Sequence, residues 1–132
     1  MNWYKKSEEL SADAFCRGYC TEFAIALHRI TAWPIFIFNE VVKEDEEEYY
    51  NLVHATVKSP NGKYVDARGF RTEQEIANNL LATDATPLGK YKIENVSEND
   101  LYASTEVIEE AIKEAEFFIS KHHKLLGIGV RK

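Results

Sequence analysis

The chain has 132 residues, 45% hydrophobic and 12% aromatic, a composition that predicts a single globular domain over residues 1–132 and excludes a disordered chain. The net charge is −6, and Lys and Arg are scattered without a basic stripe, so we expect no nucleic-acid partner. No apolar stretch approaches the roughly 18 residues of a membrane span, and no signal-peptide core follows the N-terminus, so we expect a cytoplasmic protein without membrane contact.

Two helices are expected in the first thirty residues. A short helix should occupy roughly residues 8–16, with Ser7 or Ser11 as its N-cap, and Gly18 should interrupt it. The stretch "GYCTEFAIAL" predicts a second helix that begins near Cys20 and continues to about Arg29. Its apolar positions at helical spacing are Phe23, Ala24, Leu27 and Ile30. Cys20 lies on the same face one turn earlier, so its thiol should point toward the core or along its edge.

The middle of the chain predicts strands separated by turns. "WPIFIF", residues 33–38, indicates a buried strand with Pro34 at its start, and residues 52–57 indicate a second strand. Between them, the acidic run "KEDEEE" at 43–48 is expected to be a solvated loop, with a docking patch for a basic partner as the alternative. "SPNG" then predicts a hairpin loop of Pro60, Asn61 and Gly62, with Gly62 in the left-handed conformation.

The remaining sequence predicts two helices and one strand. Thr72–Glu75 is a capping box that opens a helix ending near Leu81, and residues 90–96 indicate a strand. A long helix is expected over residues 105–124, and "GIGVRK" should be a short strand or a tail. The apolar stripe of this long helix comprises Val107, Ile108, Ala111, Ile112, Ala115, Phe118 and Ile119. We therefore predict an α+β fold in which an N-terminal helix carrying the cysteine packs on a small antiparallel sheet, with a long C-terminal helix.

The register of the predicted hairpin brings two polar residues together. A three-residue loop places Ser59 opposite Lys63 and Thr56 opposite Asp66. Because side chains alternate along a strand, His54 shares the face of Thr56 and is a diagonal neighbour of Asp66, with Cβ atoms about 7–8 Å apart. A two-residue loop would put them on opposite faces. The proline favours the three-residue loop, so a hydrogen bond between His54 and Asp66 is physically allowed after a small adjustment.

A histidine held by a carboxylate needs only a nucleophile to become a catalytic group. The carboxylate fixes the imidazole tautomer and leaves the other ring nitrogen free to act as a base. Cys20 is the candidate nucleophile, because helix N-termini and neighbouring imidazolium groups both favour thiolates. N–H groups at the helix start can also hold an oxyanion, which makes Tyr19 and Thr21 candidates for oxyanion or substrate contact. Asn39 is a candidate side-chain donor.

These segments carry a family resemblance over about residues 14–70. "GYCTEFAIAL", "HATV" and "GKYVDARG" resemble the pattern of small bacterial and phage cysteine peptidases of the papain-like and transglutaminase-like superfamily. The resemblance implies Cys20 as nucleophile, His54 as general base and acid, and Asp66 as orienting carboxylate. It implies a peptidase, amidase, deamidase or transglutaminase-like enzyme acting on a protein or peptide, and no cofactor is expected. Thr21 after the cysteine, where papain-like enzymes have Trp, favours the transglutaminase-like branch.

Other interpretations of the same residues remain open at this level. Each of the three can be structural: a buried thiol, a hydrogen-bonded core histidine, and an aspartate paired with Arg68. Cys16 is interpreted as a core thiol. A zinc site built from Cys16, Cys20 and either His54 or His28 fits no common ligand spacing, so no metal is expected. The rival function is a non-catalytic intracellular binding or inhibitor protein, for example phage-encoded, that uses the acidic 43–48 segment for docking.

Overall fold

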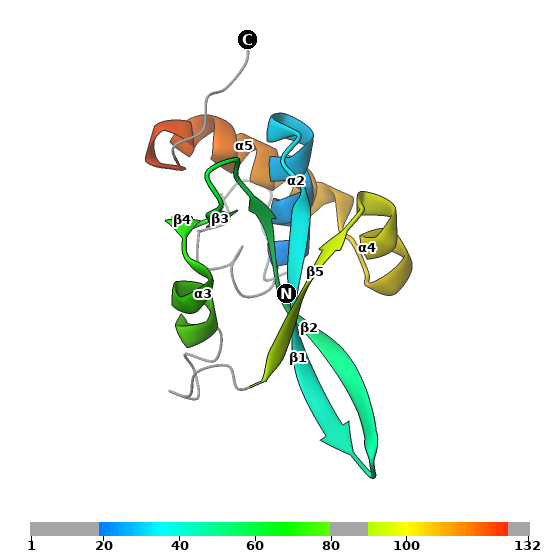
Figure 1. Cartoon of the computed structure of the whole chain (residues 1–132). Helices are drawn as coiled ribbons and strands as arrows, with labels where there is room; N and C mark the ends of the chain where they lie inside the picture. Colours follow the sequence, from blue (N-terminus) through cyan, green and yellow to red (C-terminus); the bar gives the residue numbers. More distant parts are fainter. Residues whose placement is uncertain (1–18, 80–89, 127–132) are drawn as a thin grey trace, which may run out of the picture.

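The computed structural model describes residues 19–79 and 90–126 and confirms the predicted α+β class (Figure 1). Its elements are α2 (Cys20–Thr31), β1 (Ile35–Glu44), β2 (Glu47–Lys58), β3 (Tyr64–Asp66), β4 (Gly69–Arg71), α3 (Glu73–Asn79), β5 (Tyr91–Val96), α4 (Glu98–Ser104) and α5 (Glu109–Leu126). The strands form one antiparallel sheet in the order β4-β3-β2-β1-β5. The helix expected near residues 8–16, the break at Gly18 and the "GIGVRK" segment lie outside the described residues.

Helices α2 and α5 pack together on one face of the sheet (Figure 1). From Thr21 to Leu27 every α2 residue is buried, so this helix is enclosed by the sheet and by α5 instead of facing solvent on one side. Phe23 meets Phe118 of α5 edge to face, with ring centroids 5.7 Å apart. The buried Glu22 carboxylate accepts the Ile108 N–H at 2.9 Å, which ties the first turn of α2 to the start of α5.

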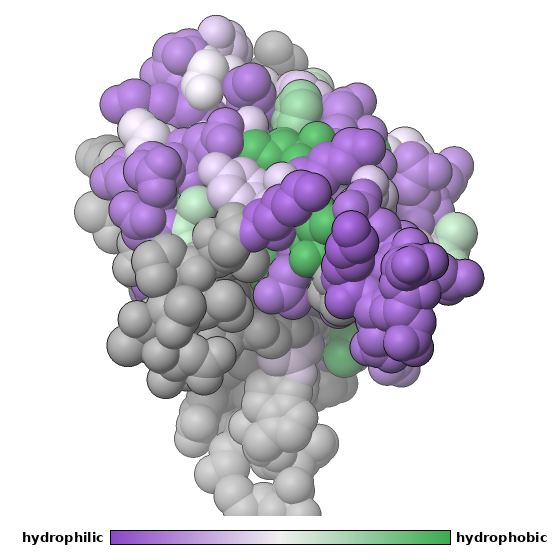
Figure 2. Space-filling view, turned by 60° about the horizontal axis from the view of Figure 1, so that its bottom comes forward, coloured by the Kyte–Doolittle hydropathy of each residue, from purple (hydrophilic) through white to green (hydrophobic). Residues whose placement is uncertain are grey.

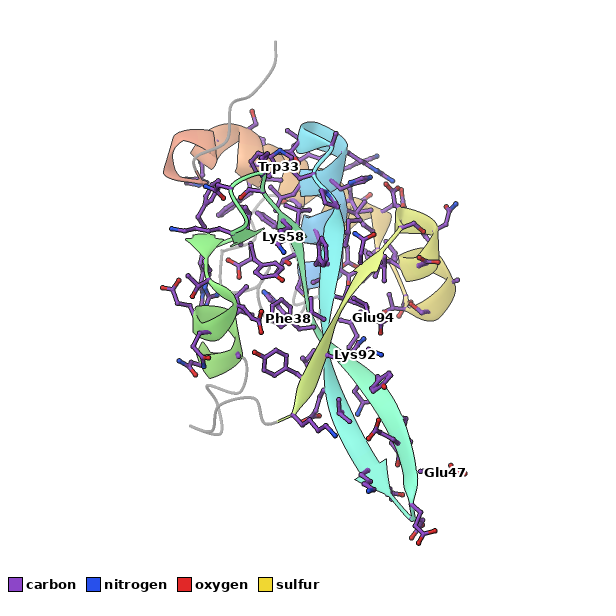
Figure 3. All side chains as sticks on the ribbon, in the orientation of Figure 1. Trp33, Phe38, Glu47, Lys58, Lys92 and Glu94 are labelled. Carbon is purple, nitrogen blue, oxygen red and sulfur yellow. The ribbon has the colours of Figure 1, made fainter. Side chains whose placement is uncertain are left out.

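The opposite face of the sheet has its own, smaller apolar cluster. Phe38 and Tyr64 point to this side, and α3 covers them with Ile76. Phe38 and Tyr64 pack edge to face with centroids 5.2 Å apart. Lys58 lies on the same side, with its Nζ 5.4 Å from the Tyr64 ring centroid (Figure 3). The sheet is therefore covered on both faces around its centre, where β2 and β3 meet.

The acidic segment 43–48 is not the solvated loop that the sequence suggests. Strand β1 continues to Glu44 and β2 starts at Glu47, so only Asp45 and Glu46 form the turn. Lys43 is paired across the strands with Glu48, and opposite charges in that position stabilise a hairpin. The resulting two-stranded extension projects beyond the rest of the described sheet, with Glu47 near its tip (Figures 1 and 3).

This turn is expected to be a site where stability can be gained. Asp45 and Glu46 have φ values of 52° and 69°, the left-handed region that Asn and Gly tolerate best. Replacing them together, Asp45→Asn with Glu46→Gly, should raise the free energy of unfolding by about 1 kcal/mol, measured by urea denaturation. The control is Glu47→Gly, which puts the glycine one residue later, in the strand, and should lower stability. A loss of stability in both variants would contradict the assigned turn.

The second hairpin forms as predicted. The Ser59 N–H donates to the Lys63 carbonyl at 2.8 Å, the Gly62 N–H donates to the Ser59 carbonyl at 2.9 Å, and Gly62 has a φ of 87°. The pair Val57–Val65 fixes the predicted register. A third hairpin, which was not predicted, follows directly, and in it β3 and β4 are joined by Ala67 and Arg68.

The remaining elements follow their capping signals, with two corrections. Thr72 and Glu75 form the predicted capping box at α3, and β5 lies within the predicted strand. Helix α4 was not predicted, although Ser97 and Asp100 form a capping box at its start. Helix α5 begins at Glu109 and not at residue 105, so Val107 and Ile108 precede it and Ile108 is exposed. The rest of the predicted stripe is buried: Ala111, Ile112, Ala115, Phe118 and Ile119.

Candidate active site

Cys20 is the first residue of α2. Tyr19 before it has φ −127° and ψ 28°, outside the helical region, while its carbonyl accepts the Phe23 N–H at 3.0 Å. The helix therefore begins at the cysteine without a side-chain cap. The N–H groups of Cys20 and Thr21 point out of the helix start and have no acceptor within the helix. Cys20 itself is half-buried and packs against the core on the α2 side of the sheet.

His54 lies in β2 directly after an irregularity in the sheet. His54 is opposite Phe38 of β1, whereas Leu52 is opposite Asn39, so Val53 is an extra residue without a partner. Such a β-bulge bends the strand and changes the direction of the side chains beside it. The His54 side chain is 2% exposed. The histidine is thus a fully buried residue in a strand whose regular alternation is interrupted at that point.

Asp66 is hydrogen-bonded to one of the two ring nitrogens of His54. The Nε2 atom of His54 lies 3.0 Å from Asp66 Oδ2, so the hydrogen bond that the hairpin register allows is formed. The same oxygen accepts Arg71 Nη1 at 3.0 Å, and Asp66 Oδ1 accepts the Arg68 N–H at 2.9 Å. The carboxylate is 3% exposed, so protein donors replace the water that an aspartate would otherwise bind.

The other nitrogen of the His54 ring is unsatisfied. Nδ1 is buried and makes no hydrogen bond of good geometry to any residue in the described parts of the chain. Because Nε2 is taken by Asp66, Nδ1 is the ring atom left for Cys20, whose thiol is close enough to act on the imidazole. The structure therefore brings Cys20, His54 and Asp66 together in this order. A buried, unpaired nitrogen beside a thiol is suited to accepting and returning a proton.

The pKa values of His54 and Asp66 both differ from their ordinary values. Burial alone lowers the pKa of His54, but the hydrogen bond to Asp66, the adjacent Cys20 thiol and the charges of both groups outweigh burial and raise this pKa to about 9. Burial alone raises the pKa of Asp66, yet the hydrogen bond and charge of His54, the charge of Arg71 and the Arg68 N–H hold it below its ordinary value. At neutral pH the histidine is therefore an imidazolium bonded to a carboxylate.

This pairing should make stability depend on pH in a defined direction. The pKa of His54 is higher in the folded chain than its unfolded value near 6.5, so its contribution is complete below about pH 6.5 and is lost as the pH rises through about 9. The free energy of unfolding should fall by up to about 3 kcal/mol over that range. Urea denaturation between pH 6 and 10 measures the fall. A His54→Gln variant should show a flatter profile, and equal slopes would contradict the assignment.

Tyr19, Thr21 and Asn39, the residues predicted to contact the oxyanion or the substrate, have little freedom to do so through their side chains. Tyr19 and Thr21 flank Cys20 but their side chains are buried. Burial, followed by the charge of Glu22, raises the pKa of Tyr19. Asn39 is a weaker donor candidate than the sequence suggests, because its Nδ2 already donates to Glu94 Oε1 at 2.7 Å. Backbone N–H groups at the start of α2 are thus the better-placed donors.

Arg71 and Glu22 are neighbours of the site that the sequence analysis did not single out. Arg71 lies in the β3–β4 hairpin, which was not predicted, so its proximity to Asp66 could not be foreseen. Glu22 had a visible signal, an acidic residue in the middle of an apolar helix. Its pKa is raised, chiefly by burial, with the charge of Glu106 acting in the same direction.

No group of His, Cys, Asp and Glu within residues 19–79 and 90–126 has the arrangement of a metal site. Cys16 lies outside these ranges. His28, the other ligand considered for zinc, has its Nδ1 2.8 Å from the Trp33 carbonyl at the end of α2. His122, near the end of α5, stacks at a tilt on Phe118 with ring centroids 4.5 Å apart. These two histidines therefore have contacts of their own within the described structure.

Comparison of the sequence with protein-family models and with curated proteins, and of the fold with solved structures, gives no match. Among the described helices, none has both the length and the apolar character needed to cross a bilayer. The face seen in Figure 2 is mainly hydrophilic with small hydrophobic areas.

Proposed function

We propose that this chain is a cysteine-dependent hydrolase or acyl-transferase that uses Cys20, His54 and Asp66. One observation carries the proposal: the buried His54 ring is bonded to Asp66 through Nε2, and Nδ1, beside the Cys20 thiol, has no hydrogen-bond partner among residues 19–79 and 90–126. A purely structural histidine would satisfy both nitrogens. The resemblance to papain-like and transglutaminase-like enzymes assigns the same roles to the same residues.

The proposed reaction proceeds through an acyl-enzyme. The Cys20 thiolate attacks the carbonyl carbon of an amide or thioester, and a C–S bond forms while the carbonyl electrons move to oxygen. The His54 imidazolium gives its Nδ1 proton to the leaving amine or thiol as the C–N or C–S bond of the substrate breaks. Water or an amine then attacks the acyl group, His54 accepts its proton, and the acyl–sulfur bond breaks to regenerate the thiolate.

The surrounding groups support both steps. The N–H groups at the start of α2 can donate to the oxyanion of the tetrahedral intermediates. Asp66, ionised and held by Arg68 and Arg71, stabilises the imidazolium and fixes the ring orientation. The substrate class that fits this chemistry is a protein or peptide carrying an amide or thioester. The nucleophile requires a reduced thiol, so the proposal includes a reducing compartment such as the cytoplasm.

4-Nitrophenyl acetate tests this proposal without a known substrate. The wild-type chain should release nitrophenol, and peptide mass spectrometry should find the acetyl group on Cys20 in preference to Cys16. Cys20→Ala should abolish this release, and His54→Ala should slow both acetylation and deacetylation. His28→Ala is the matched control, because His28 lies on α2 with Cys20 but its ring is bonded to the backbone carbonyl of Trp33. Equal acetylation of both cysteines would refute the assignment of Cys20 as nucleophile.

A second candidate function, a non-catalytic binding protein, is favoured by the projecting β1–β2 hairpin (Figure 3). Its tip carries consecutive carboxylates from Glu44 to Glu48, followed by Tyr49 and Tyr50, which are exposed by 40% and 43%. A basic peptide is the partner that matches this charge.

Calorimetry with a lysine-rich octapeptide separates the two candidates. The hairpin variant is Glu44→Gln with Glu47→Gln, and the control for net charge is Glu106→Gln with Glu109→Gln, two exposed glutamates near the start of α5. Binding that is lost only in the hairpin variant, together with no acetylation of Cys20, would favour the binding protein. Binding that falls equally in both variants would indicate non-specific attraction.

A further inference from the structure

One carboxylate oxygen of Asp66 accepts hydrogen bonds from two cationic side chains. Oδ2 accepts His54 Nε2 and Arg71 Nη1, each at 3.0 Å, while Oδ1 faces the Arg68 N–H. An aspartate that only orients a histidine needs no second cation on the oxygen that the histidine uses. The guanidinium and the imidazole therefore share the negative charge of one oxygen.

Arg71 is fixed in this position by the third hairpin and by α3. It is paired with Tyr64 across β3 and β4, and its Nη2 donates to the Glu75 carbonyl at 3.0 Å. Its side chain is 12% exposed, and two of its nitrogens are bound on different elements. The guanidinium thus approaches Asp66 from the side of β4 and α3, whereas Cys20 approaches His54 from α2.

The charged and titratable groups around the histidine are few. Cys20 from α2 and Asp66 from β3 act on His54 directly, and Asp66 faces Arg71 from β4. Cys20 and Asp66 both favour the imidazolium. Arg71 acts in the opposite direction on His54, because it is a like charge bound to the same carboxylate oxygen. As a second cation on Asp66 Oδ2, Arg71 is placed to favour release of the proton from His54.

We propose that Arg71 is a positioning residue that shares the Asp66 carboxylate with His54 and thereby sets how readily the imidazole gives up its proton. This inference rests on the proposed function, in which His54 must protonate a leaving group. Without Arg71, the carboxylate binds the imidazolium more strongly and the proton is transferred less easily. With it, Asp66 stays ionised and oriented but holds His54 less tightly.

The proposal predicts a measurable change at His54. In Arg71→Met, which keeps an unbranched apolar stem and removes the charged guanidinium, the pKa of His54 measured by NMR titration should rise by about one pH unit. Arg71→Lys retains the charge and should change this pKa much less. Arg68→Met is the control for net charge, because Arg68 contacts Asp66 Oδ1 through its backbone N–H, which the substitution retains. Circular dichroism verifies the fold of each variant.

The titrations should be repeated in a Cys20→Ser chain, where the proposed chemistry is absent but the contacts of Asp66 with His54 and Arg71 remain. A rise in the pKa of His54 in Arg71→Met in this background supports the role of Arg71 even if Cys20 proves unreactive toward 4-nitrophenyl acetate. An unchanged or lower pKa in Arg71→Met overturns the role, as does an equal rise in Arg71→Met and Arg71→Lys. In the wild-type background, the pH dependence of Cys20 acetylation should move in the same direction as the pKa.

Discussion

Replacing His54 with alanine is expected to slow the alkylation of Cys20 by iodoacetamide roughly 10- to 100-fold at pH 7. The thiolate, and not the thiol, is the species that iodoacetamide attacks, and an adjacent imidazolium favours the thiolate. His54 is an imidazolium at this pH, because its pKa is raised to about 9. Removing the ring therefore removes the positive charge that acts on Cys20. Peptide mass spectrometry with a time course of labelling measures the rate.

The chain provides its own references for this experiment. Cys16 is labelled in the same sample and corrects for reagent and time. His28→Ala removes an imidazole from the same helix, where Nδ1 lies beside the Trp33 carbonyl, and should leave the labelling of Cys20 unchanged. If His28→Ala and His54→Ala slow the labelling equally, the effect is a general loosening of α2. An unchanged rate in His54→Ala would show that the imidazole does not activate the thiol.

Removing the Asp66 carboxylate is expected to cost the most stability of any single change at the site. Asp66→Ala leaves the buried His54 and the partly buried Arg71 without their shared acceptor and removes the acceptor of the Arg68 N–H. Breaking a buried ion pair by removing one partner costs about 3–5 kcal/mol. Urea denaturation at pH 6, where His54 is protonated, should show this loss. The loss should shrink toward pH 10, since a neutral His54 no longer needs a counter-charge.

Asp100→Ala is the matched control for this change. Asp100 is also an aspartate bonded to a backbone N–H, that of Ser97 at the start of α4, but it is exposed. Its removal should cost about 1 kcal/mol, as expected for a helix cap, with little dependence on pH above 6. Asp66→Asn should fall between the two, because the amide oxygen can still accept one donor. Equal losses in Asp66→Ala and Asp100→Ala would mean that the buried charges are not coupled.

The features that local sequence determines were predictable. Turn residues fix the loop of Pro60, Asn61 and Gly62, and the loop length fixes which residues share a face. The sequence therefore placed His54 and Asp66 within reach of the bond that the structure has. The same applies to α2, whose apolar spacing is strong, although it extends to Thr31. The capping residues Thr72 and Glu75 placed the start of α3.

What the sequence did not reveal depends on tertiary contacts or on weak local signals. The tip of the β1–β2 hairpin contains residues with low strand propensity, and its ladder and cross-strand charge pair override that propensity. The third hairpin has only two residues between Asp66 and Gly69 and no Asn-Gly signal, so the position of Arg71 beside Asp66 could not be predicted. The contact of Cys20 with His54 depends on how α2 docks and on the bulge at Val53, neither of which has a local pattern.

The link between Glu22 and Ile108 has a consequence for the order in which the site forms during synthesis. A ribosome delivers Cys20 first, then His54 and Asp66, and the segment that starts α5 much later. The hairpin that joins His54 to Asp66 is local and can form within about 1–10 μs of leaving the exit tunnel. Helix α2 gains its packing partner α5 and its bond to Ile108 only after that later segment emerges. Cys20 and the pair of His54 and Asp66 are thus expected to reach their final packing only when the start of α5 has emerged and most of the domain can fold.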